Sequence, residues 1–497
     1  MVNGRTPTAG RIIGVVTLAV ALFEVTRSAL LFGFFGVGSE KDLIDAAFVV
    51  PDLLLVVFGG AHLIVALRPM LEPGDEPDAD WEVRRATMAS LRLVSLSHAA
   101  ATIVAISLAQ PLAATLFPAL SETDRIAGMM RTSLAAHMLA AVTIVLFIAE
   151  STRNPRSPAW LMAAFQIAGF GLGGILGGSD RTPESFVWGL LVGSAVAVAV
   201  AAWRFERAGM TFEWNTPWRH RSLPPLIRRT WPLTLLSLAF AAERVLPGLA
   251  GQFAGDGAVG VLTGARAVAI AAVGIGTVAA GLGGIEPEAS TTADNRWFRA
   301  LVTSILLKTV TIATFATALI VGLARPFVAT IFGYGAIDEP GIEAIATSLI
   351  WFGVGIAPMS LAAVYLRAQA RSGQVHRGGW AGLVASALAV PALSGLLDSM
   401  GSTGVGIGWL VWCLIAAAVS GVWWHRAGTA DELTGVTRHV AGSLVAAAAA
   451  GGVATVLAAV TTSIPGQVVV VVGGVVSFLV WRAVLRLVGA SITARSR

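Results

Sequence analysis

The sequence is poor in cysteine and in charge. Its single cysteine, Cys413, lies in an apolar segment, which rules out a disulfide framework and a cysteine-based metal site. Only 13% of the 497 residues are Asp, Glu, Lys or Arg, against about 25% in ordinary soluble domains. His62, His98 and His137 show no HExxH-type spacing, so core or interface histidines are favoured over metal ligands. The sequence therefore predicts no metal, no cofactor and no catalytic residues.

The chain is instead rich in long apolar segments, and 56% of its residues are hydrophobic. A membrane-spanning helix needs about 20 mainly apolar residues, and fourteen segments meet that criterion. They cover residues 11–35, 43–67, 86–108, 128–149, 158–178, 184–203, 230–250, 257–285, 300–323, 341–366, 379–398, 403–424, 440–460 and 466–488. The chain is predicted to be an all-α polytopic membrane protein with about 14 transmembrane helices.

Basic residues predict the orientation of these spans. Of the 34 Lys and Arg, 24 fall in alternate connecting segments or span ends that include both termini, and 5 fall in the other set. Cytoplasmic loops carry an excess of Lys and Arg, so both termini are expected in the cytoplasm. The basic balance is explained by topology, and no nucleic acid partner is predicted.

The longest connecting segment divides the chain into two halves. Residues 204–229 hold six Arg together with Pro217, Pro224 and Pro225, which predicts a cytoplasmic basic linker. An N-terminal lobe of six spans is then expected over 1–203 and a C-terminal lobe of six spans over 230–424. Two additional spans and a cytoplasmic tail make up 425–497.

A repeated motif supports this division. Residues 109–117 (AQPLAATLF) and 324–332 (ARPFVATIF) match at five of nine positions and lie 215 residues, or six predicted spans, apart. An even number of spans keeps both copies in the same orientation. We therefore expect two parallel pseudo-repeats with a substrate cavity between the lobes.

Charged residues deep within the predicted spans are the candidate functional residues, because a charge near the bilayer centre costs several kcal/mol and normally faces protein or water. The deepest are Glu24 and Arg27 in span 11–35, Glu243 and Arg244 in span 230–250, and Arg266 in span 257–285. Glu24 and Arg27 are three residues apart on one helical face and can partly neutralise each other. A structural ion pair is the alternative to a transport role.

Arginine in a membrane cavity suits an anion, since guanidinium stays charged and grips phosphate oxygens bidentately. A phosphate or diphosphate headgroup therefore fits better than a cationic drug. Glu243 is the candidate for ion coupling or gating with Arg244, because adjacent helix positions diverge by about 100° and Arg244 cannot neutralise it well. A salt bridge from Glu243 to Arg266 is an equally good explanation.

Several motifs resemble one family of transporters. The run Phe35-Gly36-Val37-Gly38, followed by Asp42 and by residues 47–54 (AFVVPDLL), resembles the first two spans of MurJ/MviN-type lipid II flippases. Gly264-Ala265-Arg266, the segment around 331–336 (IFGYGA), and Pro358 with residues 365–368 (YLRA) look similar to the second half of that family. The resemblance covers nearly the whole chain.

The resemblance implies the fold of the multidrug/oligosaccharidyl-lipid/polysaccharide exporter superfamily, with two six-helix lobes and two extra helices forming a groove for a lipid tail. It implies flipping of an undecaprenyl-diphosphate-linked peptidoglycan precursor, lipid II, in a bacterial plasma membrane, driven by an ion gradient or the membrane potential. By position, Arg27, Asp42 and Arg266 match functional residues of the family. Glu24 would replace an acidic residue that commonly follows the first arginine, where this chain has Ser28.

The chain also departs from the family pattern. A basic residue usual after the proline of the second span is absent from Leu54-Leu55-Val56, and the asparagine linked to sodium in some members has no counterpart in residues 387–391. Three alternatives to lipid II transport therefore stay open. They are export of another polyprenyl-linked glycan or small molecule, a non-transporting scaffold for cell-wall synthesis proteins, and a membrane glycosyltransferase. The last is the weakest, because the sequence shows neither the acidic catalytic motif nor the large polar domain expected of such an enzyme.

Overall fold

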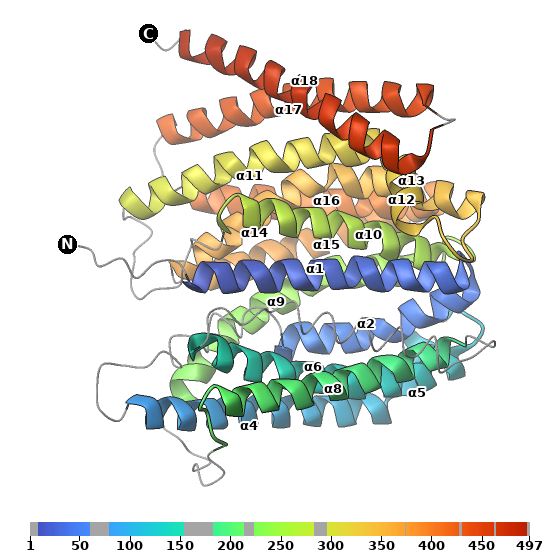
Figure 1. Cartoon of the computed structure of the whole chain (residues 1–497), viewed down its shortest axis with the longest axis vertical. Helices are drawn as coiled ribbons and strands as arrows, with labels where there is room; N and C mark the ends of the chain where they lie inside the picture. Colours follow the sequence, from blue (N-terminus) through green and yellow to red (C-terminus); the bar gives the residue numbers. More distant parts are fainter. Residues whose placement is uncertain are drawn as a thin grey trace. The chain divides into compact units, whose positions relative to one another are not determined.

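A computed structural model describes residues 8–59, 79–153, 182–212, 223–282, 296–372, 374–426, 430–461 and 464–494. Every regular element within these ranges is a helix (Figure 1). Nine described helices are long and apolar enough to cross a membrane, and a bent pair forms a tenth such span. The all-α membrane fold is confirmed. The count of fourteen stays a prediction, since the expected span 158–178 lies outside the described residues.

The chain divides into two compact units. Unit 1 comprises the described residues of Met1–Arg27 and Asp42–Val245, and unit 2 includes Ser28–Lys41, Leu246–Ile285 and the described residues of Ala289–Arg497. Two long helices, α1 (Thr8–Phe35) and α9 (Leu223–Gly251), contribute to both, and the helix that begins at Ser39 has its residues up to Lys41 in unit 2. The chain leaves unit 1 directly after Arg27 in α1 and after Val245 in α9.

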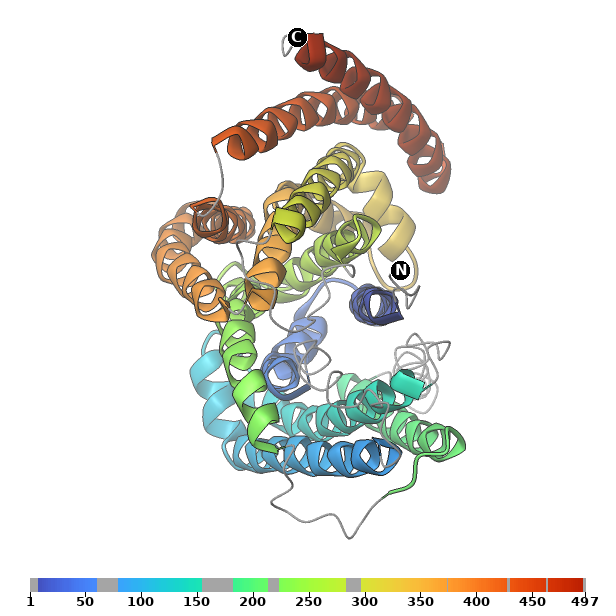
Figure 2. The same ribbon diagram turned by 90° about the vertical axis from the view of Figure 1, so that its left-hand side faces the viewer.

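Unit 1 is completed by five helices: α2 (Ser39–Gly59), α4 (Ala79–Ser107), α5 (Ala109–Leu116), α6 (Thr123–Arg153) and α8 (Pro183–Arg207). Helices α4 and α8 both pack along α6 (Figure 2). An apolar cluster that includes Leu91, Val145 and Phe205 fills the space between them. Burying each such side chain stabilises the packing by about 1.5 to 3 kcal/mol, although part of this gain is absent where the alternative surroundings are lipid.

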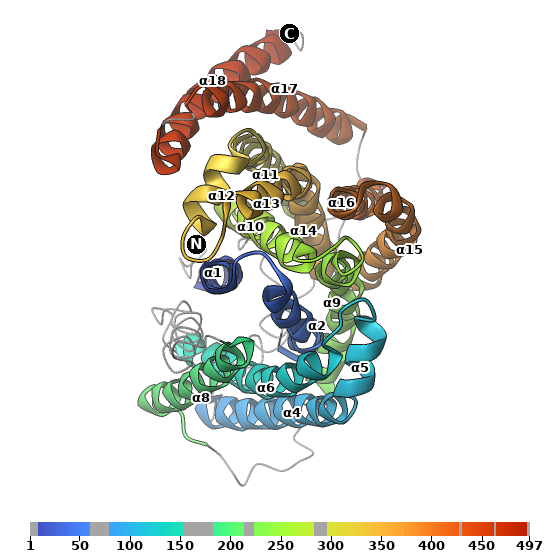
Figure 3. The same ribbon diagram turned by 90° about the vertical axis from the view of Figure 1, so that its right-hand side faces the viewer.

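Unit 2 contains the helices from α10 onward. They are α10 (Ala258–Ala279), α11 (Arg296–Gly322), α12 (Ala324–Phe332), α13 (Glu339–Val354), α14 (Ile356–Arg371), α15 (Val375–Met400), α16 (Ser402–His425), α17 (Ala430–Val460) and α18 (Gly466–Ala494). Helices α17 and α18 pair with each other, and α17 packs on α11 while α18 packs on α12 (Figure 3). The last two helices are thus attached to the first helices of unit 2 that follow α10.

The predicted span 341–366 is two helices with a 44° bend between them. The break falls at Gly355, where an added Cβ would clash with the ring of Trp409. Pro358 follows in the first turn of α14, where a residue without an N–H costs no helical hydrogen bond. Close packing of Trp409 and the nearby proline explain the position of the bend.

The 215-residue repeat has the same local structure in both copies. Helices α5 and α12 each begin after a leucine with similar backbone angles: Leu108 at φ −99° and ψ 8°, and Leu323 at φ −113° and ψ 24°. The backbone bonds match as well, since Leu108 N–H donates to Val104 and Leu323 N–H donates to Leu319. The repeat predicted from the sequence is therefore confirmed in the conformation of these segments.

Glycines hold the end of α1 within unit 2. The Ala336 N–H donates to the Gly33 carbonyl at 2.8 Å, and Gly335, with φ +78°, lies so close that an added Cβ would clash with the same carbonyl. A Cβ on Gly36, with φ +66°, would meet the Ala336 oxygen at 2.7 Å. Only glycine combines positive φ with such close backbone approach at low cost. Two motifs of the family resemblance, far apart in sequence, are side by side here.

Candidate functional site

The charged site of unit 1 is built on three helices. Glu24 and Arg27 lie on α1, Asp52 follows Pro51 inside α2, and Arg244 lies near the end of α9. The four side chains are 6 to 19% exposed. Apolar stretches surround each of these charges in the sequence, so their helices can bury them only if they meet one another.

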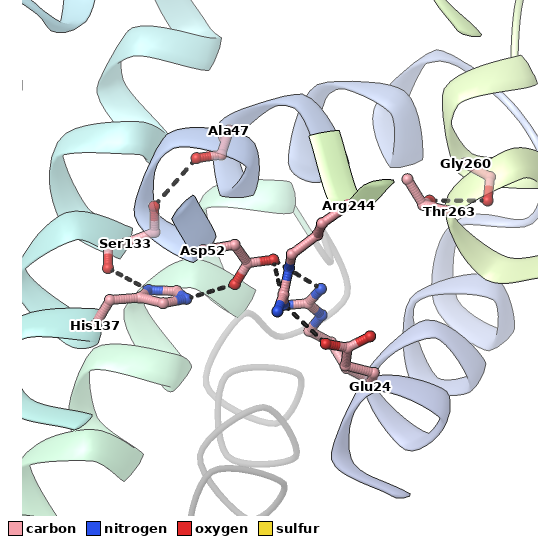
Figure 4. Close-up of polar contacts among 9 residues, drawn as sticks. Glu24, Ala47, Asp52, Ser133, His137, Arg244, Gly260 and Thr263 are labelled. Atoms are coloured by element: carbon pink, nitrogen blue, oxygen red, sulfur yellow. Dashed lines mark hydrogen bonds and ion pairs between the residues drawn. The ribbon is translucent and has the colours of Figure 1, made fainter. Parts of the chain in front are cut away.

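Arg244 joins two carboxylates. Its Nη2 lies 2.9 Å from Glu24 Oε1 and 2.9 Å from Asp52 Oδ2 (Figure 4). Both distances are those of charge-assisted hydrogen bonds. Arg244 therefore ties α1 and α2 to α9.

Arg27 is held more loosely. Its Nη2 is 3.4 Å from Asp52 Oδ2, beyond the usual range for such a bond, and its guanidinium lies 4.8 Å from the centre of the Phe48 ring. Its Nε is buried and has no hydrogen-bond partner among the described residues. Arg27 thus keeps hydrogen-bonding capacity that the described residues do not use.

His137 of α6 completes the site. Its Nε2 lies 3.0 Å from Asp52 Oδ1, and its Nδ1 lies 2.7 Å from the Ser133 carbonyl oxygen. Ser133 in turn donates through its hydroxyl to the Ala47 carbonyl of α2 at 3.3 Å. Figure 4 shows the Asp52 carboxylate between His137 and Arg244. Asp52 is consequently the centre of the site, in contact with three basic side chains.

The site brings together three of the six predicted residues. Glu24, Arg27 and Arg244 belong to it, but Glu24 meets Arg244 and Arg27 meets Asp52, pairings that the i, i+3 spacing of Glu24 and Arg27 did not suggest. Glu243 is 5% exposed on α9, beside Arg244. Its role in coupling stays a prediction.

The remaining two predicted residues lie elsewhere on α2 and on α10. Asp42 lies near the start of α2, the place in the second span expected from the sequence, and is fully buried. Arg266 is 7% exposed on α10, in unit 2. Their proposed contact with a substrate stays a prediction.

Sequence reasoning missed Asp52 and His137 as site residues. Asp52 was noted only as part of the family motif at residues 47–54 and was given no role. His137 was interpreted as a core or interface histidine. The sequence did contain a signal, because Asp52 is a carboxylate inside an apolar span. It lies just before the positions where the family usually has a basic residue.

Solved structures with a similar arrangement of helices define the class of protein. A structure described as lipid II flippase MurJ, inward closed conformation, matches with TM-score 0.71 and 15% identity over 98% of this chain and 99% of that one. An inward-facing MATE family transporter of the MOP superfamily matches with TM-score 0.62 and 15% identity over 86% and 99%. A MOP superfamily transporter from Pyrococcus furiosus matches with TM-score 0.55 and 16% identity over 88% and 99%. The fold is that of a multi-pass membrane transporter.

The family follows from the sequence itself. A family model for the lipid II flippase MurJ matches residues 32–476, and the chain belongs to that family. No curated protein matches the chain. Membership makes the protein a transporter of the plasma membrane rather than an enzyme, with a place in peptidoglycan and cell-wall biosynthesis.

Proposed function

We propose that the protein moves lipid II, an undecaprenyl-diphosphate-linked peptidoglycan precursor, from the inner to the outer leaflet by alternating access. The observation that carries the proposal is the pair of largely but not fully buried arginines, Arg27 and Arg244, on two apolar helices that meet at Asp52. Guanidinium groups in such surroundings bind phosphate oxygens well and disfavour a cationic substrate.

The two arginines differ in how closely carboxylates contact them, and this difference gives them different roles. Arg27, whose Nη2 is 3.4 Å from Asp52 and whose Nε has no hydrogen-bond partner within the described ranges, is the one that a diphosphate engages first. Arg244, with two contacts of 2.9 Å, keeps α1, α2 and α9 together until a stronger anion competes for it. Glu24 and Asp52 neutralise and orient the arginines while the substrate is absent.

Other parts of the proposal rest on the family and on charge. Asp42 and Arg266 would complete the recognition of the headgroup, and Glu243 would contribute to gating with Arg244. Helices α17 and α18 carry many exposed apolar side chains, among them Val456, Val471 and Leu479, which suit an isoprenoid tail or bilayer lipid. Both termini would be cytoplasmic, and cell-wall synthesis proteins would be neighbours.

Depletion of the protein in its host tests the choice of substrate. Lipid-linked intermediates are then extracted and assigned to a leaflet by their accessibility to an added hydrolase. We expect lipid II to accumulate in the inner leaflet. Accumulation of a different polyprenyl-linked glycan would support the second candidate, an exporter with another substrate, and would contradict lipid II as the cargo.

Substitution of Arg27 separates transport from a scaffold role. Arg27→Ala should abolish complementation of the depleted strain while the variant still inserts at the wild-type level. Losing a charge-assisted contact of about 1.5 to 3 kcal/mol lowers anion affinity by about 10-fold to 100-fold. Full complementation by this variant, together with failure of variants in the 204–229 linker, would favour the scaffold.

A further inference from the structure

We propose that Asp52 and His137 form a proton-binding site, and that the proton on this pair sets how tightly the adjacent arginines bind an anionic group. The identity of that anion as a diphosphate rests on the function proposed above. The proton site itself rests on the hydrogen-bonding geometry of the two side chains.

The geometry requires a proton between them. A carbonyl oxygen can only accept, so His137 Nδ1, at 2.7 Å from the Ser133 oxygen, must carry its hydrogen. A neutral imidazole then presents a lone pair at Nε2, which faces Asp52 Oδ1 at 3.0 Å. Two lone pairs cannot form that contact. Either Nε2 is protonated as imidazolium or Asp52 donates a carboxyl hydrogen, and both states bind one additional proton on the pair.

Charged and titratable groups around the pair come from the described helices α1, α4 and α9. Arg27 and Glu24 lie on α1 and Arg244 lies on α9, with Glu243 adjacent to Arg244. His98 of α4 interacts electrostatically with His137, but its ring stacks on Phe58 at 5.4 Å and neither of its nitrogens has a hydrogen-bond partner among the described residues. A buried imidazolium without an acceptor is costly, so the proton belongs on His137 and not on His98.

The charge balance fixes the sign of the coupling. Arg27 and Arg244 face the carboxylates of Glu24, Asp52 and the adjacent Glu243, and a proton bound to the pair makes the site more positive by one charge. A bound proton therefore favours an anion. Conversely, an anion that draws Arg27 and Arg244 away from Asp52 leaves a buried carboxylate, which then holds its proton more strongly. By linkage, each ligand raises the affinity for the other by the same factor.

The proton site can be tested without any ligand. Protein labelled with ¹⁵N-histidine is examined in nanodiscs from about pH 5 to about pH 9, the range in which histidine commonly titrates. The signal absent from His137→Gln identifies this residue among the seven histidines. We expect Nδ1 to stay protonated throughout and Nε2 to change with pH, with the change abolished in Asp52→Asn and retained in His98→Gln. An unprotonated Nδ1, or an Nε2 that does not respond to pH, would overturn the proposal.

Binding of farnesyl diphosphate in detergent micelles tests the coupling. Its own ionisation affects every variant equally, so the comparison of wild type with His137→Gln isolates the protein's proton. We expect wild-type affinity to fall with rising pH more steeply than that of His137→Gln, by up to about tenfold per pH unit for one linked proton. Equal pH profiles would refute the coupling, whereas absence of binding to wild type would refute diphosphate recognition and leave the histidine titration to decide the proton site.

Discussion

Units 1 and 2 share a structural element but differ in what they bury. Helices α5 and α12 occupy equivalent positions 215 residues apart, and each is linked to the next long helix by a polar pair at the same spacing, Gln110 to Asp124 in unit 1 and Arg325 to Glu339 in unit 2. The buried cations differ. In unit 1 Arg244 meets two carboxylates, whereas in unit 2 Lys41 lies 4.2 Å from the centre of the Phe32 ring. The repeated packing thus coexists with different surroundings for the buried cations of the two units.

The comparison separates residues that support the fold from residues that support transport. A feature present in both units at the 215-residue offset is assigned to packing, because it occurs whichever charged residues lie nearby. A feature present in one unit alone is the candidate for function. Substitutions on the two sides of this division should therefore behave differently.

The largest effect is expected from Arg244→Ala. It leaves Glu24 and Asp52 buried beside each other without their shared cation, and such losses cost about 3 to 5 kcal/mol. We expect a large fall in thermal stability in detergent and loss of transport. Arg244→Lys should recover part of the stability but not the simultaneous contact with both carboxylates. A stable, active Arg244→Ala protein would mean that the site is not held together by this residue.

A smaller effect is expected from Gly335→Ala. A Cβ there would clash with the Gly33 carbonyl and force a non-glycine residue to φ +78°, at a cost of about 1 to 3 kcal/mol. The position 215 residues earlier is Leu120, which already carries a side chain. Thermal unfolding of Gly335→Ala and Leu120→Ala should show the larger loss in the glycine variant; the reverse order would contradict the backbone contact between α1 and the loop after α12.

The smallest effects are expected at the repeated polar pairs. Arg325 and Glu339 have side chains 53 and 63% exposed, and exposed ion pairs contribute about 0 to 1 kcal/mol. Arg325→Ala and Gln110→Ala should each leave the melting temperature and the transport rate close to wild type. A severe transport defect in either variant would contradict the assignment of the repeated features to packing alone.

The fold was largely predictable because its signals are local. Apolar length located the spans, and the repeat in residues 109–117 and 324–332 located two equivalent short helices. The bend at Gly355 lies close to Pro358, a residue type that commonly kinks helices.

The site was only partly predictable because its contacts join residues far apart in the chain. Glu24, Arg27 and Arg244 were identified as charges in apolar segments, but their pairing depends on how α1, α2 and α9 meet. Asp52 and His137 are 85 residues apart, and no periodicity within one helix relates them. A buried histidine becomes interpretable only once the partners of both ring nitrogens are known.

Flipping of fluorescent lipid II in proteoliposomes tests the central claim most directly, since the claim is that Arg27 in unit 1 recognises the diphosphate. Wild type, Arg27→Ala and the exposed-pair variant Arg325→Ala are reconstituted at equal density, and translocation is followed by dye quenching from outside. The account predicts flipping by wild type and Arg325→Ala and at least about a tenfold lower rate for Arg27→Ala. Equal rates for Arg27→Ala and wild type would contradict it.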